Sequence, residues 1–297
     1  MTRRRRTSTL DALCAFCVGA VATYAASRVL RSHPPGGAQR WTRSNHAGSP
    51  VTLLEGPAYA VGVAAGALSG GAGAPAAVAG LGAAALGAFD DLGGDSSSRG
   101  LRGHLEAARR GEVTTGLVKI VGLGVTGLTT AWIADRSRER TGTPSSVGLA
   151  TLVGGGVIAG SANMVNLLDL RPGRALKVVL LLALPLVAGG RGTRLSTATA
   201  AATAGAAMAA LPDDLAGRSM LGDTGANSAG ALLGTALVAR TGLRGRLLAL
   251  SALTALTLAS EKVSFTTVIE SSPGLRRLDA LGRPPRPSPD SDPTRTL

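Results

Sequence analysis

The chain has 297 residues, of which 45% are hydrophobic and only 2% aromatic, and it carries a formal net charge of +13. A soluble core of this size normally uses more aromatic side chains, because they bury the most area per residue. Membrane helices instead pack closely through Gly and Ala, so the composition disfavours a soluble, Gly/Ala-rich α/β protein. The basic charge indicates an anionic partner, and the placement of the basic residues in short loops between apolar segments, in a chain with few aromatic residues for base stacking, disfavours nucleic acid. Anionic membrane lipids and phosphate-bearing substrates fit better.

Apolar segments recur along the chain at nearly the length of about 20 residues that crosses a bilayer. Several are shorter, but flanking Gly, Ala, Ser and Thr residues can extend them. We therefore predict an all-α integral membrane protein, a polytopic bundle of about nine transmembrane helices forming one domain, 1–283. The Pro-rich remainder, 284–297, is predicted to be a disordered cytoplasmic tail. The nine segments are 10–30, 51–71, 74–89, 117–134, 147–168, 175–189, 195–211, 227–239 and 247–260.

The polar connections alternate between the two sides of the predicted bundle. Nine spans would place the C-terminal tail on the same side as four loops, 31–50, 90–116, 169–174 and 212–224. This side carries more of the Arg and Lys residues, so the positive-inside rule assigns it to the cytoplasm, although the arginines at 3–6 favour the opposite orientation. We expect a multi-pass protein of the plasma membrane with its active site on the cytoplasmic face.

Two adjacent carboxylates, Asp90 and Asp91, follow the third apolar segment. They could simply be a solvated helix end. However, the dipole at the C-terminus of a helix disfavours negative charge, and ionisable groups at membrane depth usually mark function. Paired carboxylates suit Mg²⁺, which prefers oxygen ligands.

Two further acidic motifs occur on the same predicted side. Asn163, Asn166 and Asp169 are spaced by three residues and would share one helix face, although such a stripe could also serve helix packing. Asp223 lies between two glycines before the next apolar segment, either as part of a capped loop or beside a helix N-terminus that suits a metal and an anion. A cation would relieve the repulsion among these acids, and Arg99, Arg102 and His104 could pair with phosphates.

Taken in order, four motifs resemble those of one enzyme superfamily. They are FDD at 89–91, the GLRGH loop followed by TTGxxK at 114–119, NxxNLLD at 163–169, and MLGDTG at 220–225. This set is similar to the polyprenyl-phosphate N-acetylhexosamine-1-phosphate transferases, which include the MraY-like, WecA-like and TagO-like enzymes. The resemblance covers roughly residues 10–283.

The resemblance implies an Mg²⁺-dependent transferase of cell-envelope polysaccharide or peptidoglycan precursor synthesis. Such an enzyme moves a sugar 1-phosphate from a UDP-sugar, here UDP-GlcNAc or a UDP-MurNAc-peptide-like donor, to undecaprenyl or decaprenyl phosphate and releases UMP. By motif, Asp223 would bind the metal, and Asp90 or Asp91 would engage or deprotonate the lipid phosphate. Asn166 and Asp169 would hold the nucleotide diphosphate. The other implied substrate-binding residues are Asn163, Arg99, Arg102, His104, Lys119 and, by a looser match, His46. A homodimer is one candidate assembly.

Two alternatives remain open at this level. The first is a non-catalytic relative that binds polyprenyl phosphate or scaffolds envelope assembly. Pro172 favours it by standing where many relatives have a second Asp, as does the missing His-rich last loop, whereas the retained aspartates oppose it. The second is a transporter, which the gathering of the acids on one face, away from the midplane, disfavours.

Overall fold

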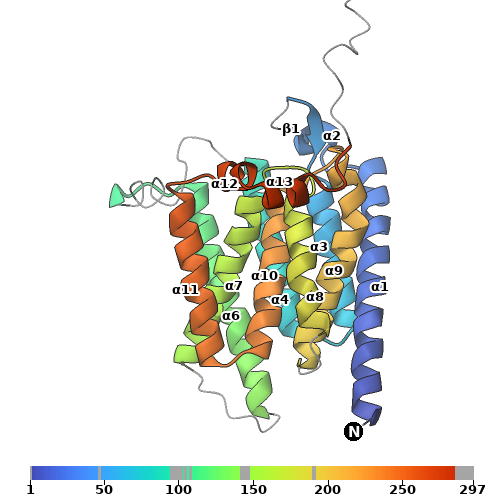
Figure 1. The fold of residues 1–297 in the computed structure, drawn as a ribbon, viewed down its shortest axis with the longest axis vertical. Coiled ribbons are helices and arrows are strands. Elements are labelled where there is room, and N and C mark those ends of the chain that lie inside the picture. The colour runs from blue at the N-terminus through green and yellow to red at the C-terminus, as the bar shows by residue number, and fades with distance from the viewer. Residues whose placement is uncertain are drawn as a thin grey trace, which may run out of the picture.

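The computed structural model describes residues 2–45, 48–93, 103, 106, 109–140, 148–188 and 192–284, and it is almost entirely helical (Figure 1). Each predicted apolar segment overlaps one long helix, in the expected order, so the prediction of a helical bundle is confirmed. The long helices of the described part are α1 (Thr2–Ser32), α3 (Glu55–Ser69), α4 (Ala74–Gly93), α6 (Thr115–Arg140), α7 (Leu149–Leu168), α8 (Arg174–Ala188), α9 (Arg194–Leu215), α10 (Gly222–Arg240) and α11 (Leu243–Ser260). The short helices are α2 (Ala38–Trp41), α12 (Phe265–Ser271) and α13 (Pro273–Ala280).

Several helices are long and apolar enough to cross a membrane. Among the described residues four helices qualify, namely those spanning Thr9–Ser32, Ala74–Gly93, Thr115–Arg138 and Leu149–Leu168. A fifth span results if α11 and α12, which meet at a bend of 91°, are counted together. The outer surface supports a lipid environment, since Val21, Val125 and Leu248 are 68%, 58% and 74% exposed. The number of nine spans stays a prediction.

Helix α10 lies at the centre of the bundle, where it packs against α3, α4, α7 and α9 (Figure 1). Small residues permit this close packing. A Cβ added at Gly87 of α4 would lie 2.2 Å from the backbone oxygen of Asp223, and one added at Gly230 of α10 would lie 2.2 Å from that of Ser161. Glycine therefore sets the distance between the central helix and its neighbours, as is common in membrane helix pairs.

The region 31–50, predicted as a polar loop, contains secondary structure that the all-α prediction missed. After α2, strands β1 (Thr42–Ser44) and β2 (Pro50–Thr52) form an antiparallel hairpin. The β2 residue Thr52 also exchanges backbone hydrogen bonds with the loop before α10, accepting from Met220 N at 3.1 Å and donating to Arg218 O at 3.3 Å. Strands of three residues are too short for an alternating pattern to reveal them.

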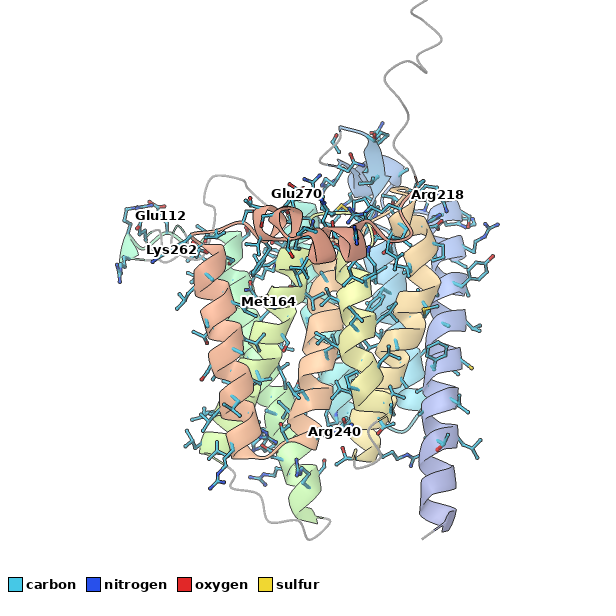
Figure 2. All side chains as sticks on the ribbon, in the orientation of Figure 1. Glu112, Met164, Arg218, Arg240, Lys262 and Glu270 are labelled. Carbon is cyan, nitrogen blue, oxygen red and sulfur yellow. The ribbon has the colours of Figure 1, made fainter. Side chains whose placement is uncertain are left out.

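The described parts of the polar connections expected to share one side lie together at one end of the bundle, which we call the site end. The hairpin, α12 and α13 gather there, whereas the N-terminus lies at the opposite end (Figure 1). Figure 2 shows Arg218 and Glu270 at the site end and Arg240 at the other. Arg283 Nε donates to Pro172 O at 2.7 Å, which joins the C-terminal segment to the 169–174 loop. The predicted disordered tail lies outside the described residues beyond position 284.

Candidate functional site

The N-terminus of α10 is held by two carboxylates from other helices. Asp91, in the last turn of α4, accepts hydrogen bonds from Asp223 N at 3.0 Å, Thr224 N at 2.9 Å and Thr224 Oγ1 at 2.6 Å. Asp169, directly after α7, accepts from Gly222 N at 2.9 Å. The first N–H groups of a helix have no partner within it, and negative charge is favourable at that end. These two aspartates therefore fix the central helix to α4 and α7.

The neighbouring carboxylate, Asp90, has different partners. Its Oδ2 lies 3.3 Å from Nζ of Lys119 on α6, and the same ammonium group forms an ion pair with Asp223 of α10. Successive helical residues point about 100° apart, so adjacent aspartates reach different surroundings. Side chains from α4, α6 and α10 thus form a partly buried charged cluster, which we call the Asp90–Lys119–Asp223 cluster.

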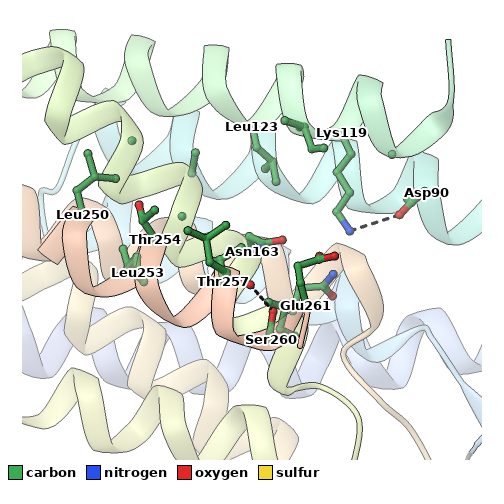
Figure 3. Close-up of a pocket in the computed structure, with 18 residues that line it drawn as sticks. Asp90, Lys119, Leu123, Asn163, Leu250, Leu253, Thr254, Thr257, Ser260 and Glu261 are labelled. Atoms are coloured by element: carbon green, nitrogen blue, oxygen red, sulfur yellow. Dashed lines mark hydrogen bonds and ion pairs between the residues drawn. The ribbon is translucent and has the colours of Figure 1, made fainter. Parts of the chain in front are cut away.

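A cavity of about 490 Å³ opens beside this cluster, between α6, α7 and α11. Asp90, Lys119, Asn163, Asn166 and Glu261 line its polar end. The remainder of the wall is mostly apolar, and Figure 3 shows Leu123, Leu250 and Leu253 continuing the cavity away from the Lys119–Asp90 pair. The cavity therefore combines a charged end with an apolar path along transmembrane-type helices.

The predicted polar stripe at 163–169 is only partly correct. Asn163 and Asn166 both line the cavity. However, α7 ends at Leu168, and Asp169 leaves the helical path with ψ of 45°. Asp169 is not among the residues that line the cavity, and its carboxylate instead accepts a hydrogen bond from Gly222 N at the start of α10.

Several acidic side chains lie close to Asp169 near the hairpin. Burial raises the pKa of the Asp169 carboxyl well above its usual range, and the negative charge of Asp214 raises it further. The Gly222 N–H partly offsets this effect, while the charges of Asp223 and Asp91 add to it. Asp214 itself accepts a hydrogen bond from Gly173 N at 3.0 Å. The expected convergence of acids from separate loops is therefore present in the fold.

The C-terminal segment is fastened across the site end by residues that the motifs did not single out. The buried Arg174 donates to both oxygens of Asp279, at 2.8 and 3.2 Å, and to Thr266 Oγ1 at 2.9 Å. Burial alone would raise the pKa of Asp279, but hydrogen bonds from Arg174 and Arg283 outweigh it and lower the pKa. The only sequence signal was the amphipathic pattern after residue 261, with Pro273 at a helix start.

Four predicted phosphate-binding residues cannot be placed. His46, Arg99, Arg102 and His104 all lie outside the described residues. Of the predicted site residues, Asp90, Asn163, Asn166 and Lys119 line the large cavity, and Asp223 joins them through Lys119.

The donor set of the charged cluster suits a hard divalent cation. Within the described ranges, no group of three or more His, Cys, Asp or Glu residues could hold a metal ion by itself. Two carboxylates, from Asp90 and Asp223, do converge on a single cationic group, the Lys119 ammonium. Mg²⁺ is commonly held by one or two carboxylates together with substrate phosphates, so these residues fit that ion in the presence of a phosphate ligand.

No protein-family model matches the chain, and no curated protein shows significant similarity to it. The chain's own motifs and geometry are therefore the basis for assigning a function.

Proposed function

We propose that the protein transfers a sugar 1-phosphate from a UDP-sugar to a polyprenyl phosphate and releases UMP, on the cytoplasmic face of the plasma membrane. The observation that carries this proposal is the cavity with the Asp90–Lys119–Asp223 cluster at its polar end. A polyprenyl phosphate matches the charged end and the apolar length of this cavity, because it has an anionic phosphate head on a long apolar chain. The head would meet Lys119, while the chain would follow the leucines of α11 towards the bilayer.

The geometry divides the roles of the adjacent aspartates. Asp90 lines the cavity, whereas both carboxylate oxygens of Asp91 are occupied by the first turn of α10. We therefore assign Asp90 to the lipid phosphate, from which it accepts the remaining proton. Asp91 and Asp169 are positioning residues that hold α10 so that Asp223 faces Lys119.

The transfer itself is a substitution at phosphorus. An oxygen of the lipid phosphate forms a bond to the phosphorus that bears the sugar, the bond from this phosphorus to the bridging oxygen breaks, and UMP leaves with the electron pair. Lys119 orients the attacking phosphate, while the Asn163 and Asn166 amides donate hydrogen bonds to the diphosphate. Asp223 would hold Mg²⁺, which would supply positive charge to the phosphates when bound.

UMP release by the purified protein tests this function. The detergent-solubilised protein is incubated with undecaprenyl phosphate, Mg²⁺ and a panel of UDP-sugars. We expect UMP with at least one donor, and its loss both in Asp223→Asn and on chelation of Mg²⁺. Asp11→Asn is the matched control, because Asp11 pairs with Arg194 at the opposite end of the bundle.

Two results would contradict the proposal. Full activity in Asp223→Asn would remove that residue from the metal role. No UMP with any donor, from folded protein that still binds undecaprenyl phosphate, would instead favour a non-catalytic protein that binds this lipid, the alternative to which Pro172 points.

A further inference from the structure

A second cavity, of about 420 Å³, lies between α1, α3 and α9 at the site end. It shares no lining residue with the cavity beside Lys119. Figure 1 shows α1 and α11 at opposite edges of the bundle, so the two cavities open on different sides. The residues that line the second cavity include Thr23, Tyr24, Ser27 and Ala58, together with the charged residues described below.

Positive charge exceeds negative charge in the wall of this cavity. Three arginines line it, Arg28, Arg31 and Arg218, against two acidic residues, Glu55 and Asp213. Two of these arginines share the carboxylate of Asp213. One of its oxygens lies 2.6 Å from Arg31 Nη2, and the other accepts a hydrogen bond from Arg218 Nε at 3.0 Å. The guanidinium group of Arg28 has no hydrogen bond or ion pair with any other described residue. An anion entering the cavity would therefore find an available guanidinium group.

The inner wall holds a buried acceptor without a partner. Glu55 is only 4% exposed, and its Oε2 accepts a hydrogen bond from the Ser219 hydroxyl. Its Oε1 is buried and has no hydrogen-bond partner within the described part of the chain. A buried polar acceptor without a hydrogen-bond donor destabilises the folded protein. A ligand that donates a hydrogen bond at this point would remove this destabilisation.

Apolar side chains are exposed on the part of α1 that lines the cavity. On the α1 turns that line it, Val21, Tyr24 and Val29 are 68%, 62% and 60% exposed. Arg28 and Arg31 lie near the end of the same helix, where a transmembrane helix reaches the phospholipid head groups. The surroundings thus offer apolar contact outside, cations at head-group level and an unpaired acceptor inside.

We propose that this cavity binds the head group of an anionic glycerophospholipid that carries hydroxyl groups, of which phosphatidylglycerol is the simplest. The phosphate pairs with Arg28 and Arg31, and a head-group hydroxyl donates to Glu55 Oε1. The acyl chains lie along the exposed face of α1. This site is independent of the transferase proposal, because none of its residues belongs to the Asp90–Lys119–Asp223 cluster.

Thermal stabilisation of the detergent-solubilised protein, titrated with defined lipids, tests the site. We expect phosphatidylglycerol to stabilise the wild type at lower concentration than phosphatidylcholine or soluble glycerol 3-phosphate does. Phosphatidylmethanol carries the same negative charge on its phosphate diester but no hydroxyl group, so the Glu55 contact predicts that it binds more weakly. Loss of one charge-assisted hydrogen bond in Arg28→Gln should raise the half-saturating concentration about tenfold.

Arg244→Gln is the matched control, since Arg244 is an exposed arginine at the start of α11, at the opposite end of the bundle. It should titrate like the wild type. An unchanged titration in Arg28→Gln would overturn the proposed site. Phosphatidylmethanol binding as tightly as phosphatidylglycerol would overturn the contact with Glu55, and equal stabilisation by glycerol 3-phosphate would overturn the lipid assignment.

Discussion

Replacing Asp91 by Asn should destabilise the protein, because the carboxylate accepts hydrogen bonds on both oxygens. Oδ1 accepts from Asp223 N, and Oδ2 accepts from Thr224 N and Oγ1. The Asn amide has one acceptor oxygen, so in either orientation its NH₂ group faces a backbone N–H of α10. One unsatisfied N–H costs about 1–3 kcal/mol. The lost negative charge at a helix N-terminus adds about 0.3–1 kcal/mol.

The combined loss of about 1–4 kcal/mol corresponds to a decrease in melting temperature of roughly 3–15 °C for a domain of this size. Asp90→Asn is a matched control at the adjacent residue. It weakens a partly exposed ion pair, typically about 0–1 kcal/mol, and also removes a negative charge from a helix C-terminus, where that charge is unfavourable. Its melting temperature should therefore stay close to that of the wild type.

Thermal unfolding in detergent, followed for both variants beside the wild type, is the assay. We expect Asp91→Asn to melt at clearly lower temperature, while Asp90→Asn remains stable but loses transferase activity. An Asp91→Asn protein that melts like the wild type would refute the assignment of Asp91 to the anchoring of α10. An equal destabilisation by both changes would refute the division of roles between the two aspartates.

Two further substitutions test the close packing at Gly87 and the buried ion pair between Arg246 and Asp135. Gly87→Ala should lower both stability and activity, because the added Cβ would clash with the backbone of Asp223. Gly93→Ala is the control, because a Cβ at Gly93 would meet open space, and it should be neutral in the same melting and UMP assays. Arg246→Met should cost about 3–5 kcal/mol, because it leaves the carboxylate of Asp135 buried without the guanidinium that now lies 2.6 Å away. If Gly87→Ala or Arg246→Met melted within about 2 °C of the wild type, the corresponding argument would be contradicted.

The sequence was informative where apolar length and motif spacing carry the signal. The helical bundle and the shared end of the acidic loops both followed from alternating apolar and polar segments. The adjacent positions of Asp90 and Asp91, however, give no indication of which carboxylate faces a cavity and which caps a helix. That distinction depends on the rotation of α4 relative to α10, which close contacts such as that at Gly87 determine.

Other features depend on contacts between distant segments and leave little local pattern. The spacing relates Asp169 to Asn166, but it gives no sign that the Asp169 carboxylate accepts from the N–H of Gly222, 53 positions away, instead of lining the cavity. Helix α11 forms one wall of the large cavity. In the sequence its leucines cannot be distinguished from those of a helix that only faces lipid. The bridge from Arg174 to Asp279 joins residues 105 positions apart, and no spacing rule predicts such a pair.

The most direct test of the central claim follows the two phosphates of the donor separately. The UDP-sugar is labelled with ³²P at either the nucleoside-linked or the sugar-linked phosphate, incubated with the protein, undecaprenyl phosphate and Mg²⁺, and the lipid is then extracted. Our account predicts that the sugar-linked label moves to the lipid, while the nucleoside-linked label stays in water as UMP. Nucleoside-linked label in the lipid, or no label there from folded protein with any donor, would contradict it.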